Sequence, residues 1–522
     1  AFAEQHQLLE RALELWDDAP EELRRRTMRQ GVEDGLGLAF SPDVTGDFVD
    51  LLAAVAVAAR LAGERERALA LCKRALRTLE GDPSPGASGR TAAGDPLRAA
   101  WFWTERHRLL RALSRSDGWD EIAHAQELVQ GLPPSVVHAE VLMNAAYWWA
   151  VHQPGPTALK TAQQAVEICR LTGAEIAGLA AQQTLAWLIM DTGDLEEGLA
   201  LARDVCEREL TPGNTDVVLR GYGNVATALH GIGRFGEAVE VAEKGSGLAD
   251  RHGLPDIASF VDGNLAESLT QLGRWSEADA VLARAVGRRG VSARTWGQVA
   301  EQRAELTLAR GAYEETRRVL DESGGWTSGP YPEPQHTLTV ARFAIALAAA
   351  DGRILDVRSL LAAEVGDGIP SGHQRYGWPL LYEAAAAEAR ARGQAVAEPG
   401  RTAAVARIRE AMRGQPDFVP LWAAQALMIE AELVTAEDGD ATAPWTGAVA
   451  GPARSSQSDP PATSTASTAA SRARACPCGS CKAAHAGCSR ASRRSTTARS
   501  PTRRAPPTRS WAAPTASTRS SR

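Results

Sequence analysis

Lysine and cysteine are scarce in this sequence of 522 residues, and their scarcity argues against several kinds of site. The lysines are Lys73, Lys160, Lys244 and Lys482. None of them belongs to a Gly-rich phosphate-binding loop, which excludes a P-loop nucleotide site from this sequence. The cysteines before residue 450 are few and widely spaced, which is typical of reduced core thiols and predicts no metal site there.

Signatures of enzymes and of membrane proteins are absent as well. There is no His-Glu-x-x-His, Gly-x-Ser-x-Gly or Gly-x-Gly-x-x-Gly motif, and the histidines are dispersed. His230 lies alone on an expected helix, where a structural or surface role is the usual one. No apolar run reaches the roughly 18 residues that cross a bilayer, and no signal peptide is recognisable. We therefore expect a cytoplasmic protein without membrane contact, cofactor, metal or catalytic residues, and not an enzyme.

Charge is divided unevenly along the chain. Residues 451–522 carry a net charge of +12, whereas the whole chain carries −7, so the first 450 residues carry −19. A body this acidic is a poor surface for nucleic acid, which requires clustered Lys and Arg.

Residues 451–522 also lack Leu, Ile, Val, Phe, Met, Tyr, Glu and Asn, so they cannot bury a core and are predicted to be disordered. A basic tail that binds nucleic acid and a metal site at the CPCGSC motif are two interpretations of this segment. A third is out-of-frame translation. Of the 72 residues, 68 have codons with G or C at the second position, as expected when the third positions of a GC-rich gene are read one base out of frame. We favour this third interpretation, which predicts no metal at these cysteines.

Within the first 450 residues one phrase occurs twice. Residues 223–242 read GNVATALHGIGRFGEAVEVA, and residues 263–282 read GNLAESLTQLGRWSEADAVL. The turn glycine of this phrase recurs every 38–41 residues, at Gly193, Gly233, Gly273, Gly311, Gly352 and Gly393. Self-similarity at such a period predicts a solenoid of stacked units, each too small to bury its own apolar face.

Each unit has the pattern of a helix hairpin. Between residues 219 and 232 the apolar and small residues fall at three- and four-residue steps, and a glycine then ends the helix in the left-handed conformation. A second amphipathic segment follows, and no segment alternates apolar and polar residues as a strand does. The predicted fold class is all-α: a superhelical solenoid of antiparallel helix pairs over residues 1–450, with residues 451–522 as a separate tail.

The pattern resembles the tetratricopeptide repeat. The packing positions of the first helix would then be Tyr222, Val225, Ala226 and Leu229 in one unit, and Asp262, Leu265, Ala266 and Leu269 in the next. Asp262 departs from the usual aromatic residue, and the period exceeds the usual 34 residues or so. The resemblance therefore implies divergent, extended repeats.

Longer segments of the sequence resemble a more specific group of helical-repeat proteins. AFAEQHQLLERALELWDDAP, GNLAESLTQLGRWSEADAVLARAV and RYGWPLLYEAAAAEARARG are similar to the helical-repeat region of the large ATP-binding LuxR-type transcriptional regulators. In that family an ATPase module precedes the repeats, and a helix-turn-helix that binds DNA follows them. This sequence shows neither module and begins inside a helical pattern. The resemblance implies a fragment that senses a ligand or partner and reaches DNA only through a missing helix-turn-helix.

The first helices of stacked repeats line a concave surface that such proteins use for partners. The residues that we expect to face it are Gln183, Trp187, Asn224, Thr227, Asn264, Glu267, Glu301 and Glu305. Asn224 and Asn264 occupy equivalent positions, where their amides would bond an extended peptide or ligand, or else neighbouring helix ends. The aromatic clusters at 101–103 and 147–149 allow two interpretations. Either one ring of each lines a cavity or a contact surface, or the large side chains only fill gaps between divergent repeats, which we favour.

Two functions fit these patterns. The first is the sensor region of a LuxR-type regulator, which binds a protein, a peptide or a small-molecule effector and relays its occupancy to ATPase and DNA-binding modules. The second is a stand-alone tetratricopeptide-repeat adaptor for a peptide or protein, with a basic tail that contacts nucleic acid. In both, the turn-rich segments 81–96 and 321–334 are predicted loops that hinge the solenoid.

Overall fold

The computed structural model describes residues 2–20, 22, 47–81, 95–113, 115–211, 213–322, 333–366 and 368–455, which belong to one compact unit. The predicted disordered tail from residue 456 onward lies outside the described residues, as do most of the two predicted hinge loops.

The described chain is all-helical, with no strand in these ranges, which confirms the predicted fold class. Its helices are α1 (Phe2–Glu14), α3 (Phe48–Leu61), α4 (Arg65–Leu79), α5 (Pro96–Ala112), α6 (Trp119–Val129), α7 (Val136–His152), α8 (Pro156–Thr172), α9 (Glu175–Asp191), α10 (Leu195–Cys206), α11 (Thr215–Gly231), α12 (Phe235–Arg251), α13 (Pro255–Gln271), α14 (Trp275–Gly287), α15 (Ala293–Ala309), α16 (Tyr313–Glu322), α17 (Pro334–Ala350), α18 (Ile354–Val365), α19 (Gln374–Arg390), α20 (Arg401–Arg413), α21 (Pro420–Ala436) and α22 (Thr442–Ser455).

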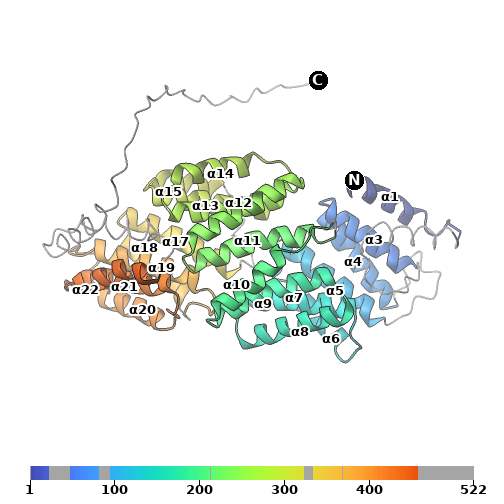
Figure 1. Cartoon of the computed structure of the whole chain (residues 1–522), viewed down its shortest axis with the longest axis horizontal. Coiled ribbons are helices and arrows are strands. Elements are labelled where there is room, and N and C mark those ends of the chain that lie inside the picture. The colour runs from blue at the N-terminus through green and yellow to red at the C-terminus, as the bar shows by residue number, and fades with distance from the viewer. Residues whose placement is uncertain are drawn as a thin grey trace, which may run out of the picture. The chain divides into compact units, whose positions relative to one another are not determined.

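From α3 onward the helices form antiparallel pairs, and each first helix of a pair is an odd-numbered one (Figure 1). The two helices of a pair are joined by a tight turn in which the repeat glycine has a positive φ, between 73° and 105° at Gly193, Gly233, Gly273, Gly311 and Gly352. Only glycine adopts this conformation without a steric penalty from Cβ, so it ends one helix and lets the chain reverse into the next.

The packing positions inferred from the repeated phrase lie in the core. Ala226 and Ala266 have no exposed surface, and Leu229 and Leu269 are also buried. Small side chains at these positions allow neighbouring helices to approach closely. The core is divided into several clusters along the stack, as expected when each repeat packs mainly on its neighbours.

The last described helix extends beyond the boundary that composition indicated. The repeat region was predicted to end at residue 450, whereas α22 continues to Ser455.

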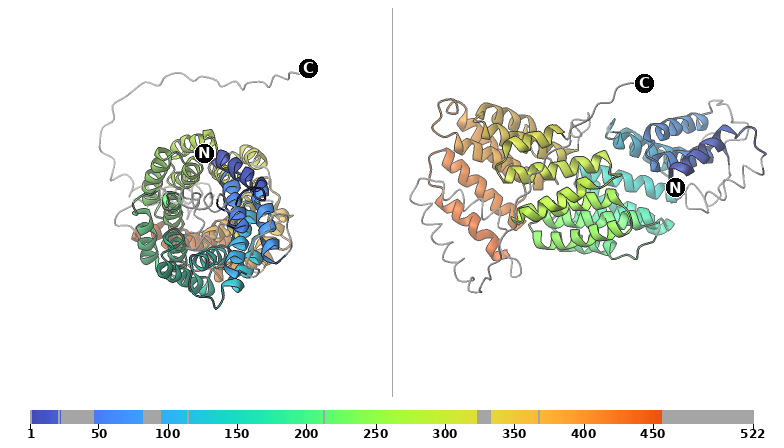
Figure 2. Two further views of the ribbon diagram at one scale, coloured as in Figure 1. Left: turned by 90° about the vertical axis from the view of Figure 1, so that its right-hand side faces the viewer. Right: turned by 90° about the horizontal axis from the view of Figure 1, so that it is seen from above.

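The pairs wind around a common axis, and the later pairs return to the earlier ones (Figure 2). Arg111 at the end of α5 donates to Glu333 at the start of α17 over 2.6 Å. Trp422 Nε1 on α21 donates to the carbonyl of Gly231 over 3.0 Å, and His373 Nε2 lies 2.9 Å from the carbonyl of Val151. Contacts between residues about 200 positions apart therefore close the superhelix around its central space.

Candidate ligand-binding cavity

The central space of the superhelix contains a cavity of about 800 Å³. Its wall comes almost entirely from the first helices of the pairs, α5, α7, α9, α11, α13, α15, α17, α19 and α21. The second helices face outward, and Phe235 at the start of α12 is the exception that reaches the wall. The repeat geometry thus places side chains from nine successive pairs around one volume.

All eight residues predicted to face the concave surface line this cavity. They come from four consecutive first helices: Gln183 and Trp187 from α9, Asn224 and Thr227 from α11, Asn264 and Glu267 from α13, and Glu301 and Glu305 from α15. Whether they bind a ligand remains a prediction. Their convergence follows from the period of about 40 residues, which returns the same helical face to the axis in each repeat.

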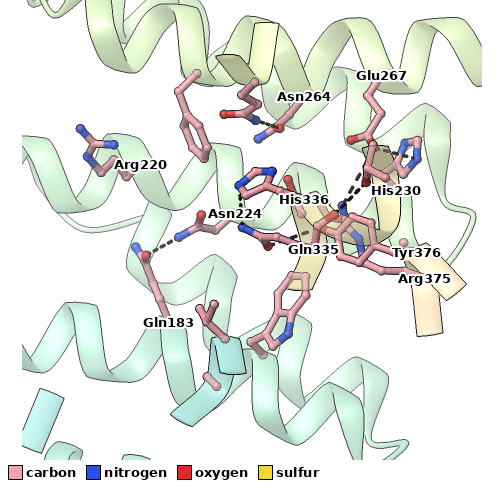
Figure 3. A pocket seen from close by; sticks show the side chains of 18 of the residues that line it. Gln183, Arg220, Asn224, His230, Asn264, Glu267, Gln335, His336, Arg375 and Tyr376 are labelled. Carbon is pink, nitrogen blue, oxygen red and sulfur yellow. Dashed lines mark hydrogen bonds and ion pairs between the residues drawn. The ribbon is translucent and has the colours of Figure 1, made fainter. Parts of the chain in front are cut away.

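Side-chain amides connect these helices across the cavity wall (Figure 3). Asn224 Nδ2 donates to Gln183 Oε1 over 2.7 Å. Asn264 Nδ2 donates to the carbonyl of Gly223 over 3.0 Å, and Asn264 Oδ1 accepts from Gln298 Nε2 over 2.7 Å. The two asparagines of the repeated phrase therefore bridge neighbouring first helices, and do not bond helix ends as the local alternative predicted.

The two asparagines are not equivalent toward the cavity. Asn264 is 3% exposed and uses both ends of its amide within the wall. Asn224 is partly exposed, and its Oδ1 receives no hydrogen bond from any described residue. Asn264 therefore holds the wall together, whereas Asn224 Oδ1 has no donor among the described residues.

The predicted acidic residues are paired with basic side chains inside the cavity. Glu267 Oε1 lies 3.5 Å from His230 Nε2, and Glu301 Oε1 lies 3.2 Å from His336 Nδ1. Glu305 forms an ion pair with Arg342. Burial raises the pKa of Glu301 and lowers the pKa of His230, so both side chains are shifted toward their neutral forms.

Several residues that line the cavity were not predicted from the sequence, and most of them lie on the later helices. His230 lines the cavity, although its isolation in the sequence favoured a structural or surface role. Arg342 on α17 and Arg375 and Tyr376 on α19 also line it. Helices α17 and α19 do not carry the Gly-Asn phrase, so no repeated signal marked which of their faces points toward the axis.

The two aromatic clusters differ in whether one of their rings reaches the cavity. In the cluster at 147–149, Tyr147 lines the cavity and is 37% exposed, while Trp148 is buried against Trp119. In the cluster at 101–103, Trp101 and Phe102 lie in the core, and Trp103 packs edge-to-face against His124 instead of reaching the cavity. The first cluster supplies a ring to the wall and the second does not.

Two further properties bear on the kind of site. In the part of the chain that the structure describes, His, Cys, Asp and Glu side chains form no group of three or more suited to a metal ion. None of the helices described here combines the length and the apolar character that crossing a membrane requires.

Comparison with known proteins identifies no family. No protein-family model matches the chain, and no curated protein matches it. Among similar solved structures is a Rap protein complexed with competence and sporulation factor, with 14% identity and a TM-score of 0.44 over 81% of this chain and 99% of that one. Another is the TPR domain of P58(IPK), with 12% identity and a TM-score of 0.23 over 81% of this chain and 97% of that one. At these TM-scores neither similarity bears on what this chain binds.

Proposed function

We propose that this chain is a peptide-binding sensor. It binds an extended peptide in the central cavity, and within a LuxR-type regulator it relays that occupancy to ATPase and DNA-binding modules. The observation that carries the proposal is the central cavity of about 800 Å³, lined by the first helices of nine pairs. This volume lies within the range of about 300–1,000 Å³ that is usual for ligand sites.

The polar groups of the wall favour a peptide. Asn224 Oδ1 and the buried Gln302 Oε1 both lack a donor among the described residues. Peptide N–H groups are suitable donors for such acceptors, and a buried acceptor left unbonded costs about 1–3 kcal/mol. Tyr147, Trp187 and Phe260 add aromatic surface for side chains. An extended chain can reach groups spread over several repeats, whereas a compact molecule would contact only a few of them.

The contacts that close the superhelix favour a sensor over a passive adaptor. Arg375 on α19 donates to the carbonyl of Thr227 on α11, and Trp422 donates to the carbonyl of Gly231. All four residues line the cavity, so a bound peptide would touch both sides of the closure. A ligand that contacts both sides binds the closed state more tightly and shifts the population toward it. The assignment to LuxR-type regulators rests on the resemblance of the repeat phrases.

The proposal is tested by filling the cavity. Ala180 on α9 lines it, whereas Gln163 on α8 is exposed on the outer helix. The full chain would be used to select peptides from a random hexapeptide library, and Kd would be measured by calorimetry. Ala180→Trp should weaken binding of the selected peptides at least 10-fold because the indole occupies their volume, and Gln163→Trp should leave Kd within about 2-fold. Equal affinity for both variants, or the absence of any enriched peptide, would overturn the proposal.

A further inference from the structure

We infer that Arg375 is the anchoring residue for a carboxylate of the bound peptide, at the junction where α19 meets α9 and α11 across the cavity. This inference rests on the proposed function and names the chemical group by which the peptide is held. It also predicts that the anchored group sits at the closure of the superhelix.

Arg375 is buried but sparsely bonded. Its side chain is 10% exposed and lines the cavity. Its Nη1 donates to the carbonyl of Thr227 over 3.0 Å, while its Nη2 lies 4.0 Å from Glu267 Oε1, beyond hydrogen-bond distance. A guanidinium carries five N–H donors, so most of its donors have no acceptor among the described residues. A buried guanidinium whose N–H donors are not already hydrogen-bonded binds a planar carboxylate strongly.

The other cavity arginines differ from Arg375 in this respect. Arg294 lies 2.7 Å from Glu333, Arg220 lies 3.0 Å from Asp216, and Arg108 lies 3.1 Å from Glu140. The fourth, Arg342, is paired with Glu305. Each of these four already has a carboxylate within hydrogen-bond reach, and Arg375 alone among the arginines lining the cavity does not.

Aromatic rings hold the Arg375 guanidinium in place. Its Cζ lies 4.5 Å from the ring centroid of Tyr376 and 5.6 Å from that of Trp187 (Figure 3 labels Arg375 and Tyr376). Stacking of this kind fixes the plane of the group and reduces the conformational entropy lost when two N–H donors engage one carboxylate. Trp187 comes from α9 and Arg375 from α19, so the binding group is complete only when the superhelix is closed.

Two carboxyl groups of the chain flank Arg375 without forming a hydrogen bond to it in the described part of the chain. Glu267 has an alternative partner in His230, 3.5 Å away. Asp191 lies in a smaller pocket beside Trp187 and Arg375, where burial raises its pKa to about 7, so much of it is uncharged at neutral pH. Because the Glu267 carboxylate already lies 4.0 Å from Arg375 Nη2, a monoanionic carboxylate suits the site better than a phosphate dianion does.

The test compares matched peptides and variants on the full chain. Hexapeptides selected by the wild-type chain would be measured with a free or an amidated carboxyl terminus, and with their Asp and Glu replaced by Asn and Gln. One of these two changes should weaken binding at least 10-fold, which also identifies whether the carboxylate is terminal or a side chain. Arg375→Gln should remove that discrimination, and Arg375→Lys should retain part of it because the charge remains without the planar fork. Arg170→Gln, which changes an exposed arginine on the outer helix α8, should leave the discrimination unchanged.

The outcomes separate this inference from the proposed function. If amidated, acid-free peptides bind as tightly as their parents to both wild type and Arg375→Gln, the carboxylate anchor is overturned and peptide binding stands. If selection with the wild-type chain enriches no peptide relative to selection with Ala180→Trp, the proposed peptide binding is disproved, and the carboxylate anchor is disproved with it. If Arg375→Gln does not fold by circular dichroism, the peptide comparison on wild type and on Arg375→Lys decides the question.

Discussion

The carboxylate of Asp262 is completely buried between α12, α13 and α14, where it accepts hydrogen bonds from three side chains. Ser246 Oγ, Arg284 Nη2 and Arg288 Nη1 each lie 2.6 Å from one of its oxygens. This network occupies the position where the tetratricopeptide pattern has an aromatic ring. At this position the hydrogen bonds and ion pairs of Asp262 therefore replace the packing of an aromatic ring.

Loss of the Asp262 carboxylate should be costly. Asp262→Ala leaves the Arg288 side chain, which is 11% exposed, with only the half-exposed Asp250 as a carboxylate partner. We expect the free energy of unfolding to fall by about 3 kcal/mol. Urea denaturation followed by circular dichroism measures this change. The control is Asp279→Ala, which removes a half-exposed carboxylate paired with Arg310 and should cost less than about 1 kcal/mol. Similar values for the two variants would contradict the role assigned to Asp262.

At the scale of the helix, the Gly-Asn phrase marks a close approach between neighbouring first helices. A Cβ added to Gly223 on α11 would overlap the Phe260 ring of α13, with the ring Cδ1 2.9 Å away. The carbonyl of the same glycine accepts the hydrogen bond from Asn264. The glycine and the asparagine of successive repeats thus act together: one lets the helices approach, and the other bonds across the contact.

A methyl group at Gly223 should therefore separate the repeats. We expect Gly223→Ala to lower the free energy of unfolding by about 1–3 kcal/mol through overpacking, despite the higher helix propensity of alanine. Gly247→Ala on α12 is the matched control, because the nearest atom to its added Cβ is the flexible Arg251 Nη1 at 3.6 Å. That variant should gain up to about 1 kcal/mol. A stabilised Gly223→Ala in the same urea experiment would disprove the close approach.

At the scale of the whole superhelix, Glu333 joins segments that are far apart in the chain. Its Oε1 accepts from Arg111 on α5 over 2.6 Å, and its Oε2 accepts from Arg294 on α15 over 2.7 Å. Burial alone would raise the pKa of Glu333, but Arg294 and Arg111 hold that pKa well below its usual range. The carboxylate is therefore ionised at neutral pH and connects three first helices, since it precedes α17.

Breaking this junction should open the superhelix. Glu333→Ala removes the common acceptor of Arg111 and Arg294, and we expect a loss of about 3 kcal/mol in stability together with a larger radius of gyration. Small-angle X-ray scattering of the full chain measures the expansion relative to wild type. Glu314→Ala, which removes an exposed carboxylate paired with Arg317 on α16, should change neither quantity appreciably. An unchanged radius of gyration for Glu333→Ala would show that the other closing contacts suffice.

The sequence by itself determined the features that depend on local chemistry. The helical periodicity between 219 and 232 predicted α11 (Thr215–Gly231) to within a few residues at its first end and one at its second. The turn glycines followed from the left-handed conformation that each hairpin requires. Repetition with a period of about 40 residues then placed Gln183, Asn224 and Glu301 on one concave face, because each repeat adds a nearly constant rotation.

Only the tertiary structure decided what meets across the cavity. The pairing of Arg111 with Glu333 and of Arg375 with Thr227 joins residues more than 140 positions apart. Such contacts depend on the summed rotation of several hairpins, and small departures in each divergent repeat accumulate to many ångströms. For the same reason the structure was needed to show that Asn264 is bonded within the wall while most N–H donors of Arg375 have no acceptor among the described residues.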